Sequence, residues 1–377
     1  MGEADTMESN DIRERLMCFF QAAMFLALYA VMGCMIILNV TRGSSGSQLY
    51  VQKQLVSMVL CLVVSFVLFM LPLESLKKLF LPGTIVAYIM LWGLFVFGRR
   101  INGSRGWYRF GTYSLQPAEI VKPLFIIALA LVCEKVRGRS AGVRLAWLLL
   151  FAGAVQLPIA LQPDWGTVLV YSVTFAAVIW CEGLPRKHLL VLAVLALGAG
   201  GLAVGMFRHV RLRFTGFFES LFTSGAPSGY HAQRLQECLV KGGWTGSMFQ
   251  RQDALNALPY RYSDSLFAGA TELLGAMGVI PIVLLCMAWC VYCFQLAAQQ
   301  KRTVPRCVYM GSGAMVSVQA FIHLAVNLGL MPNTGIPLPL FSYGGSSMLA
   351  TFVIVTMVQR LKLEKEESNR SRLSTKT

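Results

Sequence analysis

Residues 334–347 read "TGIPLPLFSYGGSS", and the chain is strongly apolar on both sides of them. Pro337, Pro339 and the Gly344-Gly345 pair prevent a regular helix through this stretch, which is nevertheless too apolar for an ordinary surface loop. Non-helical backbone at membrane depth is tolerated only where it is buried in protein or lines a polar cavity. We therefore expect this re-entrant segment to dip into the outer mouth of a helix bundle and to line a site there.

The composition indicates a membrane protein. The chain has 377 residues, of which 56% are hydrophobic and only 14% are charged, and this is too apolar for a soluble globular domain of that length. Apolar stretches of about 17 to 25 residues fit a hydrocarbon core roughly 30 Å thick. The predicted fold class is an all-α polytopic membrane protein with ten spans at 16–40, 55–73, 79–97, 117–134, 144–161, 166–181, 188–206, 267–296, 308–330 and 341–360.

Positive charge predicts the orientation of these spans. An even number of spans puts both termini on one side, and the loops on that side would hold eleven Lys or Arg residues against six in the short loops opposite. The prediction is N-in and C-in, with a cytoplasmic tail at 1–15, a membrane domain at 16–361 and a basic cytoplasmic tail at 362–377. The net charge of +15 mostly reflects this bias, so it does not indicate nucleic-acid binding.

Two segments predicted to lie outside the membrane differ from the other outer loops. One is rich in basic residues, and the other is much longer. Residues 98–119, "GRRINGSRGWYRFGTYSLQPAE", hold four of the six outer exceptions, interleaved with aromatic residues. Guanidinium groups bind phosphate oxygens in a bidentate fork and aromatic rings favour headgroup depth, so both a specific anionic-headgroup site and nonspecific anchoring to anionic lipid fit.

Residues 207–266 form the only long connection, and we expect a partly ordered outer cap there. Asp264 lies directly before the eighth span, at the outer membrane surface.

Charged and polar residues inside spans are functional candidates, because an ionised side chain near the bilayer centre costs roughly 2.5 to 3.5 kcal/mol. Glu119 and Lys122 lie three residues apart in the fourth span and can neutralise each other. They fit a structural ion pair as well as catalysis. The ninth span has a polar stripe at i, i+4 and i+8, which fits either interhelical hydrogen bonds or a direct role for its histidine: Gln319, His323 and Asn327.

The cysteines do not predict a metal site. Most of the ten lie inside apolar spans, where cysteine behaves as a small hydrophobic residue. Cys286, Cys290 and Cys293 share one helical face, but no His or carboxylate completes a ligand set. We therefore predict no protein metal site from these residues.

Four sequence blocks resemble the SEDS proteins, the shape, elongation, division and sporulation family that includes RodA, FtsW and SpoVE. The blocks occur in order over most of the chain: "GSRGWYRFGTYSLQPAEIVK" at 103–122, "LQPDWGT" at 161–167, "LPYRYSDSLFAGATELLG" at 258–275 and "GLMPNTGIPLPLFSYGGSS" at 329–347. The ten-span, N-in topology and the large loop between spans seven and eight also resemble this family.

The resemblance implies a peptidoglycan glycosyltransferase that polymerises lipid II at the outer face of the bacterial cytoplasmic (inner) membrane, together with a class B penicillin-binding transpeptidase. Such a reaction needs a base for the attacking sugar hydroxyl and positive charge for the pyrophosphate leaving group. By resemblance Asp264 is the base, and loop arginines hold the pyrophosphate, alone or with a divalent cation such as Mg²⁺ or Mn²⁺. The residues expected to bind substrate or shape its cavity are Arg105, Trp107, Arg109, Arg211, Arg213, Glu119, Lys122, Ser342, Gly344, Gly345 and Ser346.

The chain departs from the family pattern around the outer cap. Tyr262 stands where the family commonly has histidine and Tyr260 where it has an acidic residue, while Leu273 and His323 replace a glutamate and an asparagine. These changes keep open a catalytically weakened scaffold for the transpeptidase. A flippase for lipid-linked precursors is a further alternative, because transporters also combine polar bundle interiors with broken segments. The sequence does not distinguish elongation, division and sporulation.

Overall fold

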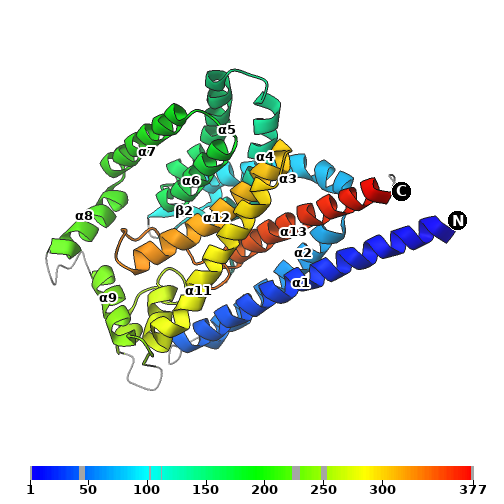
Figure 1. Cartoon of the computed structure of the whole chain (residues 1–377). Helices are drawn as coiled ribbons and strands as arrows, with labels where there is room; N and C mark the ends of the chain where they lie inside the picture. Colours follow the sequence, from blue (N-terminus) through cyan, green and yellow to red (C-terminus); the bar gives the residue numbers. More distant parts are fainter. Residues whose placement is uncertain are drawn as a thin grey trace.

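The computed structural model describes residues 2–41, 47–101, 103–111, 113–222, 230–247 and 253–374. It is a bundle of long helices with a small sheet and short helices at one end (Figure 1). Both chain termini lie at the opposite end of the bundle from α8 and α9. The helices are α1 (Gly2–Val40), α2 (Ser47–Met70), α3 (Leu73–Phe97), α4 (Pro117–Val136), α5 (Ala141–Leu161), α6 (Trp165–Cys181), α7 (Arg186–Met206), α8 (Arg208–Phe222), α9 (Tyr230–Gly242), α10 (Asp253–Ala257), α11 (Leu266–Ala298), α12 (Thr303–Asn327) and α13 (Gly345–Ser374).

Each of the ten predicted spans corresponds to a helix, although several bounds differ. Within the described residues, seven helices are long and apolar enough to cross a membrane, and the bent pair α7–α8 would make an eighth. α6 is shorter, with 17 residues, and α4 carries two charged residues near each end. A polytopic membrane fold is therefore confirmed, while the count of ten and the orientation stay predictions.

The non-helical connection between α12 and α13 begins earlier and ends later than the predicted span bounds of 330 and 341 imply. α12 ends at Asn327 instead of residue 330, and α13 begins at Gly345 instead of residue 341. A residue in the left-handed backbone region lies near each of these bounds, Gly329 after α12 and Leu340, with φ of 68°, before α13. Gly329 adopts a left-handed backbone conformation with φ of 73°, which helical residues avoid, and the prolines that follow cannot continue a helix.

A small antiparallel sheet departs from the all-α prediction. It has the order β1-β2-β3, formed by β1 (Arg99–Ile101), β2 (Ser104–Phe110) and β3 (Tyr113–Leu115), and joins α3 to α4. The sequence "SRGWYRF" in β2 is rich in aromatic residues, which favour strands. The basic and aromatic segment is therefore a paired sheet that packs beside α4.

α11 is not the uninterrupted span that was predicted. Gly275 has φ 70° and ψ 178°, so the helix breaks after its first turns. The N–H groups of Ala276 and Met277 donate to Gly243 O (2.8 Å) and Trp244 O (3.2 Å), and Ser247 N donates to Glu272 O (2.8 Å). The loop after α9 thus supplies hydrogen-bond partners at the break, which joins the outer cap to the bundle.

α12 forms the centre of the bundle. It packs against α4, α6, α11 and α13, and 78% of its most apolar stretch is buried. Glycines permit this close approach: a Cβ on Gly311 would lie 3.0 Å from Ile126 Cγ2, and one on Gly313 would lie 2.6 Å from Cys293 Cβ. Polar side chains on α12 are therefore fixed relative to all four neighbours.

Candidate active site

A cavity of about 450 Å³ lies where the re-entrant segment meets the outer cap. Its walls come from the start of α2, the β2–β3 end of the sheet, the beginnings of α4 and α6, α8, and the turn before α11. Residues 334–337 and 343–347 of the re-entrant segment complete it. Within the described residues the segment therefore lines a cavity, while its role in binding substrate stays a prediction.

Asp264 lines this cavity from the tight turn that precedes α11. The turn is held by Tyr260, whose carbonyl accepts the N–H groups of Ser263 (2.9 Å) and Ser265 (3.3 Å) and whose φ of 50° is unusual for a bulky residue. Asn327 Nδ2 donates to Asp264 O at 2.9 Å. The backbone that carries the carboxylate is thus fixed from both sides.

The electrostatic surroundings of Asp264 suit a base. Burial raises the pKa of the Asp264 carboxyl above its ordinary value, while a hydrogen bond from Ser263 and the positive charge of Arg213 lower it in part. A carboxylate with a raised pKa binds a proton more strongly than an exposed one. Arg213 on α8 and Lys53 on α2 also line the cavity, so two cationic groups share it with the carboxylate.

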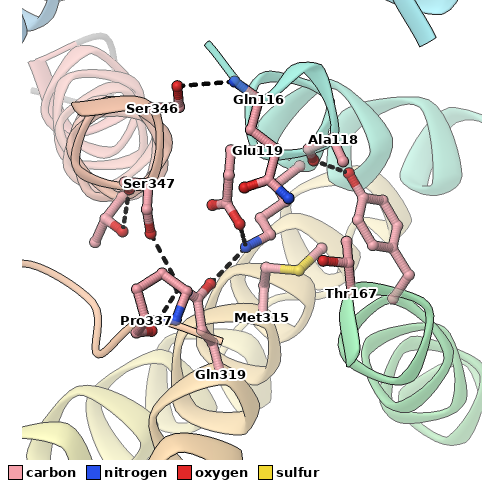
Figure 2. A network of polar contacts seen from close by, with 12 residues as sticks. Gln116, Ala118, Glu119, Thr167, Met315, Gln319, Pro337, Ser346 and Ser347 are labelled. Atoms are coloured by element: carbon pink, nitrogen blue, oxygen red, sulfur yellow. Dashed lines mark hydrogen bonds and ion pairs between the residues drawn. The ribbon is translucent and has the colours of Figure 1, made fainter. Parts of the chain in front are cut away.

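Glu119 and Lys122 form a buried ion pair beside the cavity, shown in Figure 2. Lys122 Nζ donates to Glu119 Oε1 at 2.6 Å and to Gln319 Oε1 at 2.6 Å. Both charged residues are only 1% exposed, and Glu119 is the one that lines the cavity. Glu119 Oε2 is buried and has no hydrogen-bond partner among the described residues.

A second aspartate lines the cavity. Asp164 caps α6, accepting the Thr167 N–H at 3.2 Å on Oδ1 and the Gln116 side-chain amide at 3.0 Å on Oδ2. Burial raises the pKa of Asp164, against the lowering effect of the hydrogen bonds from Thr167. Because Asp164 accepts two hydrogen bonds from the protein, it organises the wall between β2, α4 and α6.

The re-entrant segment is fixed at several points. Ser342 Oγ accepts the Leu338 N–H (2.9 Å) and donates to Ser263 O (2.8 Å), next to Asp264. Gln54 on α2 donates to Ser342 O and accepts from the Gly344 N–H at 3.3 Å. The backbone N–H of Gly344, a residue expected to bind substrate or shape its cavity, therefore already donates to a protein side chain. Ser346 Oγ accepts the Gln116 N–H at 3.1 Å, as Figure 2 shows.

The structure brings together about half of the predicted substrate residues. Those that line the cavity with Asp264 are Trp107, Arg213, Glu119, Gly344, Gly345 and Ser346. Arg105 instead donates to Phe95 O at 3.1 Å, and Arg109 and Arg211 are exposed away from the cavity. Lys122 and Ser342 lie behind the cavity wall, where they hold Glu119 and the re-entrant segment.

Sequence reasoning missed several cavity residues. Lys53 was counted only among the six basic residues of the short outer loops. It lines the cavity, and its ammonium lies 5.7 Å from the centre of the Tyr113 ring. Asp164 lies inside the block at 161–167, where an Asp three residues before Thr at the start of an apolar run is a helix-cap signal. Tyr262, at the family's histidine position, stacks on Tyr50 with ring centres 4.4 Å apart and also lines the cavity.

No metal centre is visible in the described part of the chain. It contains no group of three or more His, Cys, Asp or Glu residues that could hold an ion. Cys286, Cys290 and Cys293 are free thiols within α11.

The polar stripe on α12 is buried: Gln319, His323 and Asn327 are at most 2% exposed. His323 Nδ1 lies 2.8 Å from Ile336 O, so the stripe binds the re-entrant segment.

Comparison with known proteins places this chain in one family. The model of the FtsW/RodA/SpoVE cell cycle proteins matches residues 14–367, so the chain belongs to that family. Among curated relatives, the probable peptidoglycan glycosyltransferase FtsW of Saccharophagus degradans is 31% identical over 335 residues, covering 85% of this chain and 84% of its own. The protein of the same name from Nitrosococcus halophilus is 33% identical over 277 residues, covering 71% and 70% of the two chains.

Solved structures show the same fold. A chain from a study of how a peptidoglycan synthase complex coordinates polymerization and crosslinking superposes with a TM-score of 0.73 at 28% identity, covering 90% of this chain and 96% of the other. The rod shape determining protein RodA of Thermus thermophilus gives a TM-score of 0.64 at 26% identity, covering 90% and 95%. Both matches cover 90% of this chain.

Proposed function

We propose that this chain is a peptidoglycan glycosyltransferase that polymerises lipid II at the outer face of the bacterial cytoplasmic membrane. The observation that supports it most is the cavity itself, in which the Asp264 carboxylate shares the walls with the cationic Lys53 and Arg213. A base and a cationic cluster in one site are what transfer from a pyrophosphate-linked sugar requires. The relatives named peptidoglycan glycosyltransferase support the same activity.

The proposed reaction is a single displacement. A sugar hydroxyl of one substrate attacks the anomeric carbon of the other, and its proton passes to the Asp264 carboxylate. The bond from the anomeric carbon to the pyrophosphate oxygen breaks, and the electron pair leaves with the lipid pyrophosphate, so the anomeric configuration inverts. Lys53 and Arg213 stabilise the charge that develops on that pyrophosphate.

The proposal extends to location and partners. One substrate with a polyprenyl tail has to remain in the membrane while its headgroup reaches the cavity, which fits a site at the bundle mouth. We propose a class B penicillin-binding transpeptidase as the partner, since a matched chain comes from work on a complex that coordinates polymerization with crosslinking. We also propose that a divalent cation such as Mg²⁺ or Mn²⁺ accompanies the substrate, bound to its pyrophosphate oxygens.

The test is polymerisation of lipid II by the purified protein with its transpeptidase, in the presence of Mg²⁺, Mn²⁺ or EDTA. Asp264→Asn keeps the shape of the side chain but removes the base, so glycan strands should disappear while lipid II still binds. The matched control is Glu237→Gln, which neutralises an exposed carboxylate on α9 and should leave the strands unchanged. A wild-type protein that makes no strands with its partner present would overturn the enzyme proposal in favour of a scaffold.

A further inference from the structure

Gln319 makes three hydrogen bonds at the cavity wall, all of them seen in Figure 2. Its Oε1 accepts from Lys122 Nζ at 2.6 Å, and its Nε2 donates to Pro337 O and to Ser347 Oγ, each at 3.0 Å. The side chain is 2% exposed. A side-chain amide can accept and donate at once without carrying charge, which a carboxylate, an ammonium or an apolar group cannot do.

The orientation of this amide is determined by its partners. The reversed amide would place its NH₂ group against the Lys122 ammonium and its oxygen against the Pro337 carbonyl. Both contacts would be repulsive, and these buried polar groups would be left without hydrogen-bond partners. Gln319 therefore joins the ion pair on α4 to the re-entrant segment in one defined arrangement.

The two acceptors of Gln319 belong to separate parts of the cavity wall. Pro337 lies in the non-helical part of the re-entrant segment and Ser347 in the first turn of α13, and both line the cavity. The Gln319 side chain thus holds Pro337 and Ser347 next to each other. On its other side, Gln319 holds Lys122, which in turn fixes one oxygen of Glu119.

The free oxygen of Glu119 gives this arrangement a chemical consequence. Glu119 Oε2 is buried, has no hydrogen-bond partner among the described residues, and belongs to a residue that lines the cavity. An unpartnered buried carboxylate oxygen is costly unless a ligand satisfies it. A carbohydrate hydroxyl of the substrate can donate to it.

We propose that Gln319 is a positioning residue for glycosyl transfer, an inference that rests on the proposed function. Through Lys122 it orients Glu119 toward a sugar hydroxyl, and through Pro337 and Ser347 it keeps the re-entrant segment closed against the same sugar. Because Gln319 does not itself touch the reacting atoms, its loss lowers turnover without removing the base. Hydrogen bonds between helices alone would not include the one from Gln319 to Pro337 O, which lies in the non-helical part of the re-entrant segment.

The test compares Gln319→Leu, which removes all three hydrogen bonds, with Gln319→Glu, which keeps the acceptor for Lys122 but loses both donors. Thr174→Val is the matched control, because Thr174 is equally buried, packs beside Met315 of α12, and donates within its own helix. We expect kcat with lipid II to fall about tenfold or more in both Gln319 variants, with a smaller change in KM. Amide hydrogen exchange over residues 334–347 should rise in both, and Thr174→Val should leave each readout at the wild-type level.

A double-mutant cycle separates positioning from simple destabilisation. If Gln319 acts through the ion pair, Gln319→Leu should lower kcat less in a Lys122→Met background than in the wild type, whereas independent destabilisation would add. Ser347→Ala, which removes one acceptor, should give a smaller rise in exchange and serves if Gln319→Leu does not fold. A Gln319→Leu protein that matches Thr174→Val in kcat and in exchange would overturn the inference. A wild type without polymerase activity whose exchange still responds to Gln319→Leu would instead overturn the proposed function.

Discussion

α12 and α7 are helices of similar length that differ in almost every other respect. α12 is enclosed by other helices, and its polar side chains bind the re-entrant segment, the ion pair and the backbone of Asp264. α7 lies at the edge of the bundle in Figure 1, with Leu190 69% and Leu197 77% exposed. Polar residues within a span therefore mark the helix that organises the site, and uniformly apolar spans mark the helices that face lipid.

The lipid-facing side still contributes one charge to the site. α8 follows α7 at an angle of 102° and carries Arg213 into the cavity. Arg213 is thus held by a helix with few neighbours, whereas Lys122 is held by α4 in the centre of the bundle. Substitutions at these two basic residues should have effects of different size and kind.

The largest effect is expected for Lys122→Met. This change leaves Glu119 as a buried carboxylate without its counter-ion, and breaking a buried pair from one side typically costs about 3–5 kcal/mol. We expect a lower melting temperature in detergent and a polymerisation rate that is strongly reduced but still measurable, checked by thermal unfolding and by the polymerisation assay.

The control for Lys122→Met is the double variant Glu119→Gln with Lys122→Met. It removes both charges, so most of the thermal stability should return while activity stays low, because Glu119 is also lost from the cavity wall. Equal melting temperatures for the single and double variants would show that the charge of Glu119 is not what destabilises the single variant.

A smaller effect is expected for Arg213→Gln, and it should depend on pH. In the proposed mechanism the base works as a carboxylate, so polymerisation should fall as the pH drops through the raised pKa of Asp264. Arg213 lowers that pKa, so its removal should raise the pKa further and move the acid limb of the pH–rate profile to higher pH. At optimal pH the lost charged contact should reduce the rate roughly 10- to 100-fold, equivalent to about 1.5–3 kcal/mol.

Arg211→Gln is the matched comparison for Arg213→Gln, since Arg211 lies on the same helix but is exposed away from the cavity. Its pH–rate profile should coincide with that of the wild type. An acid limb that moves equally in both variants would show that the net charge of α8 matters and that the position of Arg213 does not.

The sequence predicts the helices and the central charges well because both depend on local composition. An apolar run long enough to span is a helix wherever it packs, and Asp264 and Glu119 stand out as carboxylates next to or inside such runs. The re-entrant segment was predictable for the same reason, since its prolines and glycines exclude a helix locally.

The remaining features depend on which segments meet. Arg105 and Arg109 share a basic stretch in the sequence, but strand pairing directs one to the end of α3 and leaves the other exposed. Lys53 reaches the cavity only because α2 packs against α13. The break at Gly275 is stable because the loop after α9 lies against it, and that contact joins residues distant from any local pattern.

Adding a methyl group at a glycine compares the helices around the cavity with the exposed helix α7. A Cβ on Gly166, in the first turn of α6, would lie 2.9 Å from Thr334 O in the re-entrant segment. Gly166→Ala should therefore displace the cavity wall and cost about 1–3 kcal/mol, with a several-fold loss of polymerisation. Wild-type activity and melting temperature in this variant would mean that the re-entrant segment yields there without consequence.

The smallest effect is expected for Gly200→Ala on α7. Apart from the adjacent residues and the backbone of α7 itself, no atom of the described residues lies within 4 Å of the position that a Cβ would occupy there, so the methyl group meets no neighbouring element in the described part of the chain. Alanine favours a helix by about 0.8–1 kcal/mol over glycine, so the melting temperature should stay equal or rise slightly. Polymerisation should not change if α7 only faces lipid and carries α8. A clear loss of activity in Gly200→Ala, with stability intact, would show instead that α7 has to bend during turnover, because a helix stiffened at this glycine resists bending while its contacts stay the same.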